Sequence, residues 1–170
     1  MRAQDIINAQ KDIFDWGIPK QGGMTSSAFP LLKRRKQGLR LGSNFRWRLI
    51  RFKSLQETFR ILITYHTVVE HYTAYMGMEV GPDTRLIMEY AYHGTHPGWH
   101  THTGCGDIRL LPIGMLRGPW LSRLPGARRF TRQKLYVPGG SGMTDQIALQ
   151  IAAKRFKLHN KVGDLFGGRP

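Results

Sequence analysis

The sequence predicts an α+β fold in which a mainly antiparallel sheet of about four to five strands lies between an N-terminal helix and a C-terminal helix. Three observations lead to this prediction. Runs of β-branched and aromatic residues fill the middle of the chain, both ends carry apolar residues at helical spacing, and 170 residues with 41% hydrophobic content suffice for one core. We therefore expect a single α+β domain over residues 45–160.

The N-terminal helix is predicted over residues 3–15, where most of one helical face is apolar. The apolar residues on that face are Ile6, Ile7, Ile13 and Phe14. Gly17 and Pro19 then end the helix, so residues 1–19 form the N-terminal element.

A basic linker or arm is predicted over residues 20–44, because glycine, serine and proline interrupt any periodicity there. Its cations gather in a short stretch: Lys33, Arg34, Arg35, Lys36 and Arg40. Such charge runs are also typical of a solvated linker without a ligand.

Four antiparallel strands are predicted next, at residues 45–52, 58–66, 71–79 and 84–92. Over 45–49 apolar side chains alternate with arginines, which gives one apolar and one cationic face. A turn at 81–83, Gly-Pro-Asp, separates the last two strands. Part of 56–76 could instead be helical, but its β-branched residues favour strands.

The C-terminal part is predicted to be a long basic loop followed by a helix. Residues 111–138 hold four prolines and six basic residues but no acidic ones. Thr144 suits the N-cap of a helix at about 145–158. The buried stripe of that helix is predicted to include Ile147, Ile151 and Leu158. The glycine-rich segment 139–142 reads as a turn or an anion-binding helix start, and residues 161–170 as a flexible tail.

Charge is the strongest compositional signal. The chain carries 26 Lys and Arg against 11 Asp and Glu, a formal net charge of +15. Such a field attracts polyanions and makes binding salt-dependent, so nucleic acid is the expected partner, with an acidic protein or mere solubility as alternatives. The candidate nucleic-acid-binding residues are Lys33, Arg34, Arg35, Lys36, Arg46, Arg48, Arg51 and Arg109. The sequence identifies no protein partner.

A cytoplasmic protein without membrane association is expected. No apolar run reaches the length that crosses a bilayer, and the N-terminus lacks the apolar core of a secretory signal. The chain has one cysteine, which cannot form an intramolecular disulfide and suits a reducing compartment.

The segment 89–107 concentrates reactive side chains: four of the seven histidines, the only cysteine and two carboxylates. On a strand ending at 93, Glu89 and His93 share a face; in an extended segment, so do His100 and His102. Imidazole and thiolate are ligands that zinc prefers. The predicted ligands of a divalent metal, zinc, are His93, His100, His102 and Cys105, and the predicted catalytic bases are Glu89 and Asp107.

Three other interpretations of this segment stay open. The metal could be structural, with four protein ligands. The site could work without metal, with His100 or His102 as general acid and base on a phosphodiester. Finally, the segment could be turns and aromatic packing, with Trp99 buried and the histidines hydrogen-bonded.

Two further patterns bear on the histidines. The phrase Gly98-Trp99-His100-Thr101-His102, followed by Gly104 and Asp107, resembles the JAMM-type metal isopeptidases, in which a His-x-His pair precedes a serine and an aspartate. The resemblance covers residues 98–107 and lacks the Ser-x-x-Asp spacing of that family, so it is not adopted. The spacing of His66, Glu70 and His71 is one residue longer than the zinc-protease motif H-x-x-E-H, but either histidine could reach the 93–107 segment across the sheet.

Together these patterns predict a metal-dependent hydrolase, a nuclease or phosphoesterase, that acts on nucleic acid or a nucleotide. Phosphate would be held by Arg109 with Arg46 or Arg48. The alternative is a non-catalytic, basic nucleic-acid-binding protein with a structural metal or none.

Overall fold

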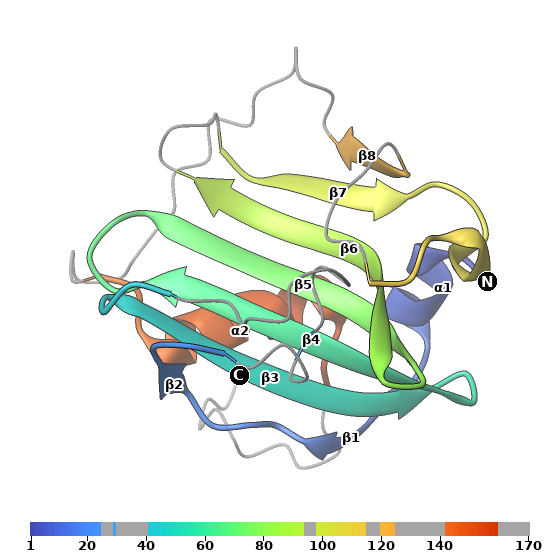
Figure 1. Ribbon diagram of the computed structural model, residues 1–170, viewed down its shortest axis with the longest axis horizontal. Coiled ribbons are helices and arrows are strands. Elements are labelled where there is room, and N and C mark those ends of the chain that lie inside the picture. Colours follow the sequence, from blue (N-terminus) through green and yellow to red (C-terminus); the bar gives the residue numbers. More distant parts are fainter. Residues whose placement is uncertain (25–28, 30–40, 94–97, 115–119, 125–141, 160–170) are drawn as a thin grey trace, which may run out of the picture.

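A computed structural model describes residues 1–24, 29, 41–93, 98–114, 120–124 and 142–159. Its centre is an antiparallel meander of four long strands (Figure 1), which are β3 (Phe45–Ser54), β4 (Glu57–His66), β5 (His71–Val80) and β6 (Asp83–His93). These strands confirm the four predicted ones and exclude the helical alternative for 56–76. Their residues alternate between two buried faces, which is why both faces are rich in apolar side chains.

The sheet is larger than predicted, because short strands extend the meander on both sides. Eight strands form one sheet in the order β1-β3-β4-β5-β6-β7-β8, and β2 also pairs with β3. The added strands are β1 (Asp12–Asp15), β2 (Lys20–Gln21), β7 (His100–Gly104) and β8 (Leu121–Leu124). The prediction of four to five strands was therefore too low, although the α+β class and the antiparallel arrangement are confirmed.

The N-terminal helix is shorter than predicted. Helix α1 spans Ala3–Asn8, and the chain then becomes β1, in which Ile13 lies opposite Phe52 of β3. The buried Lys11 side chain donates from Nζ to the carbonyl oxygens of Ile7 (2.8 Å) and Ala9 (2.9 Å), so it satisfies groups that a further helical turn would have bonded. Pairing with the edge of β3 thus replaces helix over residues 12–15.

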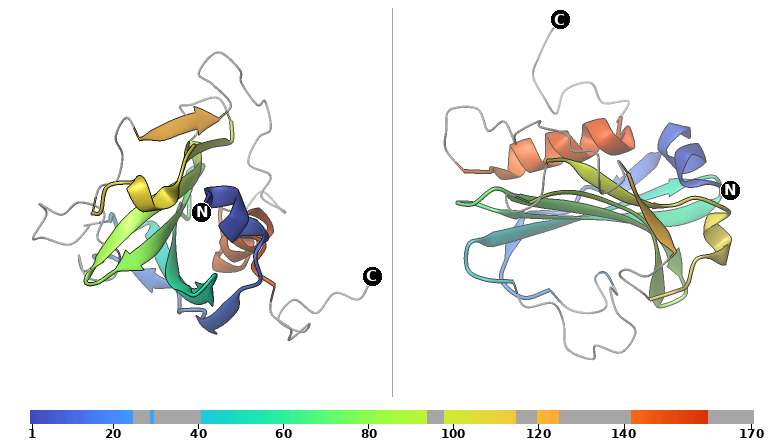
Figure 2. Two further views of the ribbon diagram at one scale, coloured as in Figure 1. Left: turned by 90° about the vertical axis from the view of Figure 1, so that its right-hand side faces the viewer. Right: turned by 90° about the horizontal axis from the view of Figure 1, so that it is seen from above.

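Both helices cover the same face of the sheet (Figure 2). Helix α2 spans Asp145–Phe156, as predicted, and the Thr144 hydroxyl accepts a hydrogen bond from the Ile147 amide at 3.3 Å. Its fully packed residues are Ala148, Ala152, Phe156 and, just beyond the helix, Leu158. The predicted stripe was partly wrong, since Ile147 and Ile151 are only half-buried. Small alanines let the helix lie close to the sheet, where the buried Tyr72 hydroxyl donates to the Ala148 carbonyl at 3.2 Å.

Two apolar clusters fill the two faces of the sheet. The larger lies between the sheet and the helices and includes Phe52, Phe59, Tyr72 and Phe156. The smaller lies on the opposite face and consists of Met24, Phe29, Trp47, Leu62 and Leu86. The opposite face therefore has its own core beside β3, β4 and β5, and the histidines lie further along this same face.

Several sequence predictions fall on segments outside the described residues. They include the cations 33–36 and Arg40, most of the basic loop 111–138, residues 139–141 and the tail 161–170. The described part of the basic loop, residues 111–114 and 120–124, contains β8 and directly follows a short 3-10 helix, Ile108–Leu110. Among the described helices, none has the length and apolar character needed to span a membrane.

Candidate functional site

Four histidines from three neighbouring strands gather on the sheet face opposite the helices. His71 of β5 lies directly opposite His93 of β6, and on β7 His100 and His102 lie opposite Ala91 and Glu89. Neighbouring ring centroids are 4.7 Å apart for His71–His93, 5.4 Å for His93–His100 and 5.3 Å for His100–His102. These four residues, His71, His93, His100 and His102, are the histidine cluster.

His66 adjoins the cluster through an aromatic neighbour. The Phe45 ring lies between them, with centroid distances of 4.9 Å to His66 and 5.2 Å to His71. The Nδ1 atom of His66 accepts hydrogen bonds from the backbone amides of Val68 (3.0 Å) and Val69 (2.9 Å). That nitrogen therefore holds the β4–β5 turn together and is occupied.

A buried carboxylate lies beside the histidine cluster. Glu89 is fully buried, and the strand register places it between Tyr75 of β5 and His102 of β7. The two pairs predicted from the sequence, Glu89 with His93 and His100 with His102, are therefore brought together on one face. A carboxylate next to a histidine can fix the orientation and proton position of the ring.

Two short contacts involve the Nδ1 atoms of the cluster. Nδ1 of His100 lies 3.3 Å from the Gly98 carbonyl oxygen, which only accepts, so Nδ1 is the donor in that contact. Nδ1 of His71 and Nδ1 of His93 are 3.2 Å apart. Two nitrogens that bind one tetrahedral zinc at ~2.0–2.1 Å stand about 3.3 Å apart, so this pair has the spacing of two ligands.

The side chains as they stand do not complete a metal shell. Within the described ranges, no group of three or more His, Cys, Asp or Glu side chains is arranged to hold a metal ion. A third ligand would require rotation of the His100 or His102 ring, or a donor from outside these ranges, where the sequence has His96.

The electrostatics keep His71 neutral more readily than an ordinary histidine. Burial lowers the pKa of His71, and repulsion from His66 lowers it further, while Glu89 acts in the opposite direction. A neutral imidazole is the form that binds a metal or accepts a proton.

The other two predicted site residues, Cys105 and Asp107, are not brought to the histidine cluster. They follow the far end of β7, and Cys105 is exposed. The Asp107 carboxylate caps the 3-10 helix by accepting from the Arg109 amide (3.0 Å), pairs with the Arg109 guanidinium (2.7 Å) and lies 3.5 Å from the Met1 ammonium. Bonds from Arg109 hold the pKa of Asp107 far below its usual value.

The predicted phosphate-binding arginines that are described already have protein partners. Arg48 pairs with Asp145 of α2 and donates to the Trp16 and Gly17 carbonyls, and Arg51 bonds Glu79 at 3.0 Å. The other two have weaker partners. Among the described residues, the Arg46 side chain donates to the nearby backbone carbonyls of Ser43 and Phe45, and the exposed Arg109 pairs with Asp107. The structure thus gives Arg48 and Arg51 structural partners, while 33–36 lie outside the described residues.

Aromatic packing supports the β6–β7 pair from the helix side. Trp99 stacks on Tyr90 with centroids 4.6 Å apart, and the Arg155 guanidinium lies 5.0 Å from the Tyr90 ring centroid. Arg155 also donates to the Thr101 hydroxyl at 3.1 Å. The aromatic packing that the third interpretation expects is therefore present on the opposite face from the histidines, although Trp99 is half-buried and not fully buried. The hydrogen-bond contacts of His71, His93 and His100 also agree with that interpretation.

His71 is the member of the histidine cluster that was not among the predicted ligands. The expectation that His66 or His71 could reach segment 93–107 across the sheet holds for His71. Its exact place could not be predicted, because the register set by the turn at 81–83 pairs residue 71 with residue 92. A bulge between Met76 and Gly77 shifts the pairing by one residue and places His71 opposite His93.

Comparisons with known proteins give no match: no protein-family model, no curated protein and no solved structure is similar to this chain. Its function has to be inferred from the residues and their geometry.

Proposed function

We propose that this protein is a zinc-type metal-dependent hydrolase that acts on nucleic acid or a nucleotide. One observation carries the proposal: four histidines from β5, β6 and β7 meet on one sheet face beside the fully buried Glu89. Buried carboxylate–histidine groups of this kind are the usual surroundings of a catalytic metal.

Each member of the site has a distinct proposed role. His71 and His93 would bind the metal through the Nδ1 atoms that are 3.2 Å apart. His100 would be the third ligand after a ring rotation, which leaves one position for water. Glu89 is better placed to orient His102 than to contact bulk water, because it is fully buried.

The charge of the chain supports a phosphate-bearing substrate. The described part of the chain holds 14 of the 26 Lys and Arg and 10 of the 11 Asp and Glu. The remaining segments therefore hold 12 basic residues and a single acidic one. Those segments supply most of the net charge of +15. Binding to a polyanion should therefore weaken steeply as salt is raised.

The test is a hydrolysis assay on an activated phosphodiester and on single-stranded and duplex nucleic acid. Activity should disappear after chelation and return when zinc is added. It should be lost in His100→Ala/His102→Ala, while His159→Ala, which changes an exposed histidine, keeps it. Circular dichroism establishes that the variants are folded. A folded double variant with full activity would refute the proposal.

A second candidate is a non-catalytic nucleic-acid-binding protein. Among the described residues, no three His, Cys, Asp or Glu side chains are arranged to bind a metal ion, which favours this second candidate. The concentration of positive charge in a few segments favours it as well. Salt-sensitive nucleic-acid binding without metal uptake or hydrolysis would decide for this candidate.

A further inference from the structure

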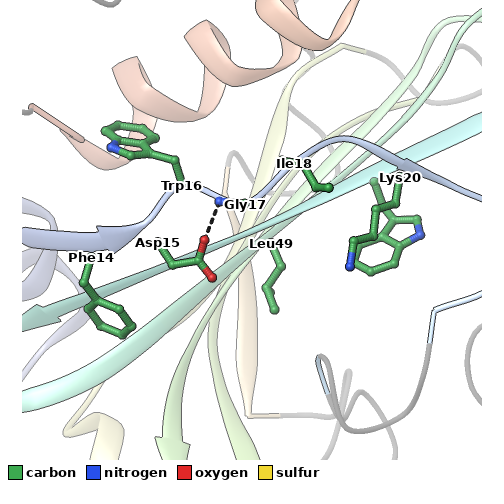
Figure 3. A pocket seen from close by; sticks show the side chains of 8 residues that line it. Phe14, Asp15, Trp16, Gly17, Ile18, Lys20 and Leu49 are labelled. Carbon is green, nitrogen blue, oxygen red and sulfur yellow. Dashed lines mark hydrogen bonds between the residues drawn. The ribbon is translucent and has the colours of Figure 1, made fainter.

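A second candidate binding site is a groove at the β1–β2 edge of the sheet. Strands β1 and β2 both pair with β3, and the connection between them lies against the Leu49 backbone at Gly17. The groove there has a volume of about 440 Å³ (Figure 3). Its lining includes Phe14, Asp15, Ile18, Lys20, Trp47 and Leu49.

Gly17 is required for the shape of this groove. Its φ is +60°, and a Cβ atom there would lie 2.1 Å from the Leu49 carbonyl oxygen. Only glycine lets the connection lie against β3 in this way. On the two sides of it, Phe14 and Ile18 are left 48% and 68% exposed, which makes the groove open and partly apolar.

Cations lie over the aromatic rings of the groove. The Lys20 ammonium is 5.2 Å from the Trp47 ring centroid, and the Arg51 guanidinium is 5.1 Å from the Phe14 centroid. Among the described residues no carboxylate pairs with Lys20, whereas Arg51 is held by Glu79. The Asp15 carboxylate is the one acidic group in the lining, and it accepts the Gly17 amide at 2.8 Å.

We infer that this groove binds an unpaired base of single-stranded nucleic acid, with Phe14 as the stacking surface and Lys20 as the phosphate contact. Aromatic rings interleaved with cations are the usual means of holding single strands. The inference rests on the proposed function and narrows its substrate, because paired bases within a duplex are not free to stack on Phe14.

The groove and the histidine cluster lie on the same face of the sheet. The register runs from Leu49 through Leu62 and Tyr75 to Glu89, which is three strand spacings, or about 14 Å. A single strand held at the groove would have to pass over the smaller apolar cluster, which buries Leu62 on this route, before a neighbouring phosphate meets the histidines.

The experiment measures the affinity of the full chain for a short fluorescein-labelled single strand and for the duplex of the same sequence. DNA and RNA versions are compared at low salt by fluorescence anisotropy. The single strand should bind more tightly than the duplex, and Phe14→Ala should weaken it about five- to a hundredfold. Lys20→Ala should weaken it and reduce the salt dependence.

The matched control is Leu110→Ala, which removes another exposed apolar side chain, 84% exposed, away from the groove. It should leave the affinity unchanged. Wild-type affinity in both Phe14→Ala and Lys20→Ala, or equal affinity for duplex, would overturn the inference. Because hydrolysis of the small phosphodiester does not need the groove, its loss in the histidine variants is an independent result.

Discussion

The ion pair between Arg48 and Asp145 fastens helix α2 to the sheet, and its removal should destabilise the fold. Nε of Arg48 donates to the Asp145 carboxylate at 3.1 Å, and its terminal nitrogen pairs with the second carboxylate oxygen. Nη1 donates to the carbonyls of Trp16 (3.2 Å) and Gly17 (3.1 Å). One side chain thus joins β3, the β1–β2 connection and the first turn of α2.

The magnitude follows from the burial of the pair. The Arg48 and Asp145 side chains are 12% and 25% exposed, so the burial of this ion pair is intermediate. Disrupting a fully buried ion pair costs about 3–5 kcal/mol, whereas an exposed pair contributes at most about 1 kcal/mol. The substitution Arg48→Met also leaves two backbone carbonyls without this donor. We expect a loss of about 2–3 kcal/mol in the free energy of unfolding.

The assay is urea unfolding followed by tryptophan fluorescence and circular dichroism, for Arg48→Met, Asp145→Asn and the double variant. The double variant should be more stable than the sum of the single losses predicts, with a coupling of about 1–2 kcal/mol. A loss below about 0.5 kcal/mol, or strictly additive losses, would refute the reasoning.

Two further predictions concern the backbone and acid stability. The substitution Gly142→Ala should cost about 1–3 kcal/mol, because its Cβ would lie 1.5 Å from the Thr67 carbonyl oxygen, whereas Gly106→Ala, with no atom within 4 Å, should be nearly neutral in urea unfolding. Burial raises the pKa of Glu79, but hydrogen bonds from two arginines outweigh it, so the pKa lies below 4.5. The stabilisation that ionised Glu79 provides is present at neutral pH and is lost as the pH falls through that lowered pKa. The Glu79→Gln variant should therefore be less stable than the wild type at pH 7 and lose less stability on acidification. An unchanged dependence of the unfolding free energy on pH would contradict this prediction.

The long strands could be predicted because their sequence pattern and their final environment agree. Residues 45–93 combine β-branched and aromatic runs with a clear turn at 81–83, and local preference alone suffices there. Strands β1, β2 and β8 have two to four residues each. Such lengths carry no readable period, and these strands form because β3 and β7 offer backbone partners.

The N-terminal error has the same origin. Ile6, Ile7, Ile13 and Phe14 fit a helical face, but the position opposite Phe52 is decided by a contact with a strand some forty residues further along the chain. No local pattern contains that information.

The gathering of the site's side chains on one face follows from period-two alternation within each strand, whereas the position of His71 depends on the register between strands. Glu89, His93, His100 and His102 follow from alternation along two strands. His71 joins them through the β5–β6 pairing, which also includes a bulge at Met76/Gly77. Cys105 was predicted as a ligand because it is close to His100 in the sequence. In an extended strand each residue carries the chain ~3.3 Å further, so Cys105 ends up far from His100 in space.

The most direct test of the account is zinc binding by isothermal titration calorimetry. The wild-type protein should bind one zinc, His71→Ala/His93→Ala should bind none at the same concentrations, and His159→Ala should bind as the wild type does. Binding should also weaken as pH falls, because protonated imidazoles cannot ligate. Wild-type protein without zinc affinity, or a folded His71→Ala/His93→Ala variant that binds zinc like wild type, would contradict the central claim that the histidine cluster is a metal site.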